Sequence, residues 1–150
     1  MRFRLLHLLK SDPARLLVGA EALLTLAWAS AIIQVLPFRI VAGIACHSAR
    51  SPQRHCQPGD SSVRICCWAM EAWSKRVPWK AVCFQKGLAL QLMLRRRGVR
   101  AKLHYGVAQT AAEGLRAHVW ISVGSTVVLG GETASEFTCL ATFPAGQTNT

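Results

Sequence analysis

The chain has 150 residues, of which 51% are hydrophobic, and 18 basic against 7 acidic side chains give it a formal net charge of +11. This length suits one domain with a hydrophobic core. So high a positive charge is typical of proteins that bind nucleic acid, anionic lipid or an acidic peptide, but also of a basic surface that is only solvated. Because no zinc-finger, helix-turn-helix or alternating aromatic–basic pattern is present, we expect no nucleic-acid partner.

The six cysteines have an irregular spacing that matches no small secreted disulfide scaffold, and they are residues 46, 56, 66, 67, 83 and 139. A reducing, cytoplasmic setting fits them better. Cys46, His47, His55 and Cys56 are thiol and imidazole groups of the kind that bind zinc, but they lack the usual Cys-x-x-Cys and His-x-x-x-His spacing. We therefore expect a connecting loop there, with no metal and no cofactor.

An apolar segment over residues 14–36 dominates the N-terminal part of the chain. Asp12 and Pro13 before it are typical of a helix start. The segment is long enough to span a bilayer, which takes about 20 apolar residues. Glu21 argues against this, since a carboxylate in hydrocarbon is costly. We expect a buried or interface helix, with a membrane-associated helix as the alternative.

A proline ends this helix at Pro37, and residues 38–48 predict a short second helix. The prolines and polar residues of 50–59 predict a loop. We take this loop as the boundary between an N-terminal helical arm, residues 1–50, and a catalytic core, residues 51–150, within one compact domain. A further helix is predicted over residues 62–76, with an apolar face that includes two of the six cysteines.

Cys83 stands at the start of the next predicted helix, in which apolar residues recur at helical spacing. Arg95, Arg96 and Arg97 fall in its last turn, where positive charge suits the helix dipole, and Gly98 ends it. At the opposite end, unpaired amide N–H groups and the positive end of the dipole stabilise a thiolate. The position of Cys83 therefore favours a reactive thiol.

The remainder of the chain alternates in polarity as strands are expected to do, over residues 99–107, 116–123, 126–129 and 137–143. His118 and Trp120 fall on the same face of the second of these strands. A cysteine at a helix start and a histidine on a following strand are the two parts that a thiol nucleophile needs. The pattern of helices followed by strands predicts an α+β fold.

Two segments carry a family resemblance: PWKAVCFQKGLALQLMLRRRGVRAKLHYGV at 78–107 and AHVWISVGSTVVLGG at 117–131. Together they resemble the cysteine protease that cleaves the leader peptide in lasso peptide biosynthesis, in its stand-alone catalytic form. That family belongs to the transglutaminase-like branch of papain-type folds. The resemblance implies N-terminal helices followed by a core in which the nucleophile, at a helix N-terminus, packs on a small antiparallel sheet.

The site implied by the resemblance has Cys83 as nucleophile and His118 as base. The family places an acid downstream of the histidine, and Glu132 is the predicted equivalent here, although a backbone carbonyl or an amide side chain could orient the ring instead. The backbone N–H of Cys83 is a candidate for binding the oxyanion. Trp79 and Trp120 are predicted to line the substrate cleft.

The implied activity is removal of the leader from a ribosomally made precursor peptide. The implied partners are that precursor, a separate leader-recognition protein, and an ATP-dependent cyclase that closes the macrolactam ring. We expect a cytoplasmic protein, with membrane association through residues 14–36 as the alternative. The residue pattern leaves open a transglutaminase-like acyltransferase and a non-catalytic membrane-associated scaffold. Five basic residues form either a contact for an acidic leader or a solvated face: Arg95, Arg96, Arg97, Arg100 and Lys102.

Overall fold

Helices come first and strands follow in the computed structural model, which describes residues 13–46, 57–110 and 114–144. The described helices are α2 (Pro13–Val35), α3 (Phe38–Cys46), α4 (Ser61–Ser74) and α5 (Cys83–Arg96). The strands are β1 (Ala101–Thr110), β2 (Gly114–Val123), β3 (Thr126–Leu129) and β4 (Thr138–Phe143), with a short 3-10 helix η1 (Ala134–Glu136) before β4. The predicted α+β class is confirmed.

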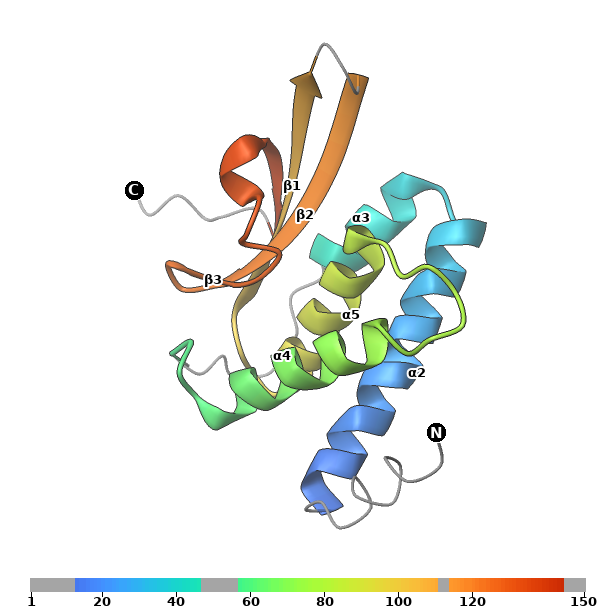
Figure 1. Ribbon diagram of the computed structural model, residues 1–150, viewed down its shortest axis with the longest axis vertical. Helices are drawn as coiled ribbons and strands as arrows, with labels where there is room; N and C mark the ends of the chain where they lie inside the picture. The colour runs from blue at the N-terminus through green and yellow to red at the C-terminus, as the bar shows by residue number, and fades with distance from the viewer. Residues whose placement is uncertain (1–12, 47–56, 111–113, 145–150) are drawn as a thin grey trace.

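The four strands form one antiparallel sheet in the order β3-β2-β1-β4. β1 and β2 make a long hairpin that extends beyond the helices (Figure 1). A close contact between helix and sheet occurs at Gly87 of α5, where an added Cβ would lie 2.7 Å from Cγ1 of Val119 and 3.6 Å from Cδ1 of Leu103. The absence of a side chain at Gly87 therefore lets α5 pack directly on the inner face of the hairpin.

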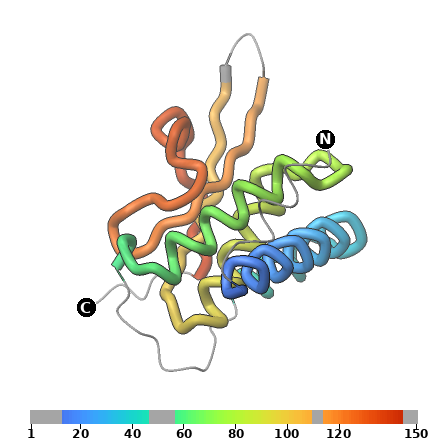
Figure 2. Tube along the Cα trace, turned by 60° about the horizontal axis from the view of Figure 1, so that its bottom comes forward, coloured from blue at the N-terminus to red at the C-terminus, as the bar shows by residue number. Residues whose placement is uncertain are grey.

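α5 is the central helix, because it packs on β1 and β2 and also contacts α2 and α4. α2 and α4 lie side by side and both pack against α5 (Figure 2). Buried side chains therefore occur all round α5, including Leu88, Leu90 and Leu94. Gln91 is also fully buried, and its Nε2 donates hydrogen bonds to the carbonyl oxygens of Ala101 (3.3 Å) and Phe143 (2.7 Å). The Gln91 side chain thus links α5 to the first residue of β1 and to the last residue of β4.

α2 buries one side and exposes the other. Leu26 is fully buried in the core that α5 shares, while Leu17, Leu24 and Val35 are 72%, 70% and 79% exposed. α2 is the described helix that is long and apolar enough to cross a membrane, although length and composition alone also fit a core helix. The packed side is what a buried or interface helix requires, and the membrane-associated helix remains the alternative prediction.

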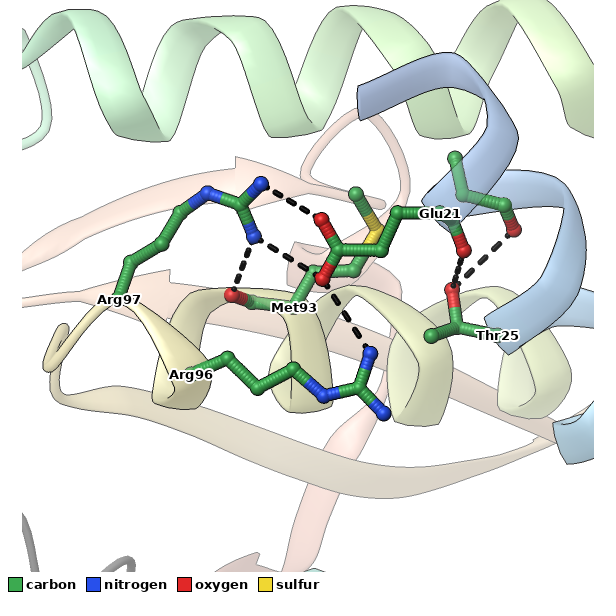
Figure 3. A network of polar contacts seen from close by, with 6 residues as sticks. Glu21, Thr25, Met93, Arg96 and Arg97 are labelled. Atoms are coloured by element: carbon green, nitrogen blue, oxygen red, sulfur yellow. Dashed lines mark hydrogen bonds and ion pairs between the residues drawn. The ribbon is translucent and has the colours of Figure 1, made fainter. Parts of the chain in front are cut away.

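The last turn of α5 holds the N-terminal helices in place. Arg97 donates to both carboxylate oxygens of Glu21, at 3.1 and 2.6 Å, and Arg96 lies 3.3 Å from the same carboxylate (Figure 3). Arg95 donates to the carbonyl oxygens of Ile44, at 2.9 Å, and Ala45 at the end of α3. These three arginines thus bind the chain's own helices, whereas the exposed Arg100 and Lys102 belong to the surface.

The predicted elements match the observed ones closely, and the strand expected over 126–129 has the bounds of β3. The N-terminal arm shares its hydrophobic cluster with the core, since Ala22 and Val41 belong to the same buried group as Leu88 and Val119. Of the cysteine and histidine constellation, Cys46 ends α3, and the other three members lie outside the described residues. Within the described ranges, no group of three or more His, Cys, Asp or Glu residues is arranged to hold a metal ion.

Candidate active site

Cys83 is the first residue of α5, and its position follows from how the helix begins. Val82 is the N-cap residue with an extended backbone, and its N–H donates to Oε1 of Gln85 at 3.1 Å. The N–H of Lys86 donates to the carbonyl of Val82 at 3.2 Å and closes the first turn. The N–H of Cys83 itself has no acceptor within the helix, since the first turn leaves its amides unpaired. Cys83 is a half-buried free thiol.

His118 lies on β2, opposite Gly106 of β1, and is half-buried. Its Nε2 is 2.9 Å from the carbonyl oxygen of Gly130, just after β3. The ring stacks near Trp120, with centroids 6.1 Å apart at 23°, and meets Phe137 at 5.0 Å. The imidazole therefore contacts two aromatic rings and has one nitrogen hydrogen-bonded to the backbone.

Cys83 and His118 line the same cavity, which has a volume of about 250 Å³. It is formed by the end of α2, α3, the start of α5, and the hairpin, and its lining residues are Ile33, Leu36, Phe38, Val41, Cys83, Phe84, Tyr105, Ala117, His118 and Val119. Aromatic rings from three elements contact one another in the cavity wall. The ring centroid of Phe38 lies 5.8 Å from that of Phe84 and 6.0 Å from that of Tyr105. Among the described residues no hydrogen bond joins the thiol to the imidazole. Val119, the next residue of β2, packs against Gly87 of α5, so strand alternation directs the side chain of His118 toward the other face of the sheet. Cys83 and His118 both line the cavity, but the thiol and the imidazole are not in contact.

The two tryptophans predicted to line the cleft lie in different places. Trp120 packs against the ring of His118, and its own ring covers Gly106, where an added Cβ would be 2.8 Å away. Neither Trp120 nor Trp79 is among the lining residues of the cavity that holds Cys83. The indole N–H of Trp79 donates to Oγ of Ser30 on α2 at 3.0 Å. Trp79 therefore ties the segment before α5 to α2.

Glu132 is exposed and makes no hydrogen bond to His118 within the described part of the chain. The group on the ring nitrogen is the carbonyl of Gly130, two residues earlier. A backbone carbonyl is the predicted alternative to Glu132, and Gly130 supplies one. The role of Glu132 stays a prediction, and the structure provides it with no contact to the imidazole.

A second histidine, His104, lies next to Trp120 on the sheet. The ring nitrogens of His104 lie 3.1 Å from Oγ1 of Thr142 and 2.8 Å from Oγ of Ser122, and the ring stacks on Trp120 at 5.5 Å. Burial, followed by the positive charge of Lys102, lowers the pKa of His104. The lowered pKa favours the neutral ring, and the stacking contact places a second histidine against Trp120.

Sequence reasoning missed Gly130, Phe137 and the apolar cavity wall. The two consecutive glycines after the strand at 126–129, Gly130 and Gly131, are the available sequence signal for a close backbone approach at that point. The cavity wall comes from Leu36 and Phe38, which are far in sequence from Cys83 and offered no local signal.

Comparison with known proteins identifies the fold family. A family model described as the transglutaminase-like superfamily matches residues 21–142. No curated protein and no solved structure matches the chain. The matched region begins within α2, includes Cys83 and His118, and ends within β4. Because it covers most of the chain, the protein belongs to the transglutaminase-like superfamily, whose members are generally cysteine-based enzymes.

Proposed function

We propose that the protein is a cysteine endopeptidase that removes the leader peptide from a lasso peptide precursor. The observation that carries the proposal is that Cys83, a free thiol at a helix N-terminus, and His118 line one cavity, in a chain of a superfamily of cysteine-based enzymes. The lasso-specific part rests on the resemblance of residues 78–107 and 117–131 to the leader-cleaving proteases.

In the proposed reaction, His118 takes the proton of the Cys83 thiol and the sulfur attacks the carbonyl carbon of the scissile bond. The carbonyl π electrons move to oxygen, and the unpaired N–H at the start of α5 donates to that oxyanion. His118 then gives its proton to the leaving amine as the C–N bond breaks, which leaves a thioester on Cys83. Water, deprotonated by His118, hydrolyses the thioester and restores the thiol.

The chemistry of the cavity supports an apolar side chain beside the scissile bond. Its ten lining residues include no Asp, Glu, Lys or Arg. A charged substrate side chain would therefore lose its hydration without gaining a partner there. Phe38, Phe84 and Tyr105 offer an aromatic wall of the kind that binds aliphatic or aromatic groups.

We further propose the partners that the resemblance implies: a separate leader-recognition protein that delivers the precursor, and an ATP-dependent cyclase that acts on the freed core peptide. The exposed side of α2 is compatible with a location at a membrane or in a complex, and the cytoplasm is the compartment that the free cysteines favour.

A transglutaminase-like acyltransferase is the second candidate, and the superfamily match favours it. It would form the same thioester on Cys83. The two reactions differ in the acceptor, which is water in hydrolysis and an amine in acyl transfer. The masses of the products separate them.

The test is incubation of the precursor peptide with the protein, with and without the leader-recognition protein, followed by intact-peptide mass spectrometry. Two fragments that sum to the precursor plus one water support the protease, and a new amide cross-link supports the acyltransferase. Cys83→Ala and His118→Ala should abolish either product. Cys139→Ala is the matched control, because Cys139 is an exposed free thiol outside the cavity. Unchanged products from Cys83→Ala would refute the proposal.

A further inference from the structure

We infer that the backbone carbonyl of Gly130 orients the catalytic imidazole of His118, in the place where a carboxylate side chain is expected. This inference rests on the proposed function for its catalytic meaning. The hydrogen bond between His118 and Gly130 is present in the resting protein and can be tested without substrate. Gly130 is thus a positioning residue that acts through its main chain.

The hydrogen bond fixes the tautomer of His118. A carbonyl oxygen can only accept, so the nitrogen 2.9 Å away, Nε2, must carry the hydrogen and donate it. In the neutral ring the other nitrogen, Nδ1, then has a free lone pair. Nδ1 is consequently the atom of the neutral His118 ring that can accept a proton.

Gly130 is a glycine for two independent reasons. Its φ of +71° lies in the left-handed region, which favours glycine. An added Cβ would also lie 2.8 Å from the carbonyl oxygen of Val119 and 3.3 Å from Nε2 of His118. Any side chain at this position would press on the bonded nitrogen or displace the carbonyl that holds it.

The aromatic neighbours keep the ring in this orientation. Trp120 lies on one side of the His118 ring and Phe137 contacts it at 5.0 Å, and both are buried. The guanidinium of Arg116 lies 5.5 Å from the centroid of Phe137. Aromatic contacts on the ring resist its rotation and limit water near the hydrogen bond, which makes that bond stronger than in solvent.

No carboxylate takes this role among the described residues. Glu132 and Glu136 follow Gly130 in sequence and are both exposed. Neither makes a hydrogen bond to His118 in the described part of the chain. The carbonyl of Gly130 therefore orients the ring without adding the full negative charge of an acid.

The test is ¹⁵N NMR of the His118 ring in resting protein carrying Cys83→Ala, which needs no substrate. We expect Nε2 to be protonated and Nδ1 to have the shift of an unprotonated nitrogen. Glu132→Gln should leave this signature unchanged. A resting ring with the hydrogen on Nδ1, or a tautomer that changes in Glu132→Gln, would overturn the inference.

Gly130→Ala should populate the other tautomer and, with Cys83 intact, lower kcat by about 100-fold with a smaller change in KM. Gly124→Ala is the matched control, since Gly124 also has a positive φ, +60°, but no atom within 4 Å of an added Cβ. It should keep both the tautomer and kcat.

Circular dichroism checks folding, and a Gly130→Ala protein that is folded with an unchanged tautomer and kcat contradicts the inference. Should no peptide be cleaved while the tautomer is as expected, the proposed function fails and the orientation by Gly130 stands.

Discussion

The carboxylate of Glu21 and the guanidinium of Arg97 are joined by two hydrogen bonds, at 3.1 and 2.6 Å, across residues 76 positions apart in sequence. This pair links α2, whose end forms part of the cavity wall, to α5, which carries Cys83 at its other end. The contact is only partly exposed, with 22% of the Glu21 side chain accessible. The ion pair therefore fixes α2, and with it part of the cavity wall, against the helix that carries Cys83.

Replacing Glu21 by Gln should destabilise the protein by about 1–2 kcal/mol, a value between those of exposed and buried ion pairs. The reason is that Arg97 would lose a charged partner while staying partly buried. Urea unfolding followed by circular dichroism measures the change. Glu71→Gln is the control, because Glu71 is exposed on α4 and should alter the free energy of unfolding by less than about 0.5 kcal/mol. Equal effects of the two variants would show that the pair contributes nothing.

The same pair predicts a dependence on pH. Burial raises the pKa of Glu21, but the hydrogen bonds and positive charges of Arg97 and Arg96 outweigh it, so the pKa lies below its ordinary value of 4.5. A carboxyl with a lowered pKa in the folded state stabilises the protein above its unfolded pKa and loses that contribution as the pH falls. The difference in unfolding free energy between wild type and Glu21→Gln should be constant at neutral pH and shrink below about pH 4.5. A difference that grows on acidification would contradict the ion pair.

Thiol labelling should separate the cysteines by burial. Burial raises the pKa of Cys67 to about 11 and also raises that of Cys66. Because the thiolate is the reactive form, both should label slowly with iodoacetamide near neutral pH. Cys83 should label faster, and peptide mapping by mass spectrometry gives the rates. Faster labelling of Cys66 than of Cys83 would argue against the reactive position of Cys83.

The apolar cavity predicts a defect when its wall is shortened. Phe38→Ala removes an aromatic contact with Phe84 and Tyr105, and should lower kcat/KM for the precursor about tenfold, or roughly 1.4 kcal/mol. Ile40→Ala is the matched control, since Ile40 is 50% exposed on the same helix but does not line the cavity. If Ile40→Ala impairs cleavage as much as Phe38→Ala, the cavity does not bind the substrate.

Trp79→Phe distinguishes the predicted cleft role of this residue from its observed contact. The variant keeps an aromatic ring but loses the hydrogen bond to Ser30, so it should cost about 0.5–1.5 kcal/mol of stability. Ser30→Ala removes the same bond and also the one from Oγ of Ser30 to the carbonyl oxygen of Leu26, at 2.8 Å, so it should cost more. The double variant should cost less than the sum of the two, because they share one bond. Cleavage by folded Trp79→Phe should stay near wild type. A large fall in kcat/KM without loss of stability would restore the cleft role.

Much of the fold was predictable because its signals are local. The helical spacing after Cys83 and the alternation around His118 and Trp120 identified α5 and β2 directly. The start at Pro13 and the end before Pro37 bounded α2 in the same way. Such patterns reflect which face of each element is buried, and neighbouring residues are enough to reveal it.

The contacts within the site were less accessible to sequence reasoning. The bond from His118 to Gly130 depends on how the end of β3 lies beside β2, which no spacing along one strand encodes. The sequence offers Glu132 as the orienting group because an acidic side chain is visible there, whereas a carbonyl is present at every residue and leaves no mark in the sequence. Trp79 was placed by its nearness to Cys83 in sequence, whereas its partner Ser30 lies on α2.

The most direct test of the central claim is capture of the acyl-enzyme. Protein mixed with precursor is quenched in acid, and its intact mass and peptide map are recorded. The account predicts an adduct with the mass of the acyl fragment, released by hydroxylamine and mapped to the peptide that contains Cys83, and no adduct in Cys83→Ala. Cleavage of the precursor with no adduct on Cys83, together with full activity of Cys83→Ala, would contradict it.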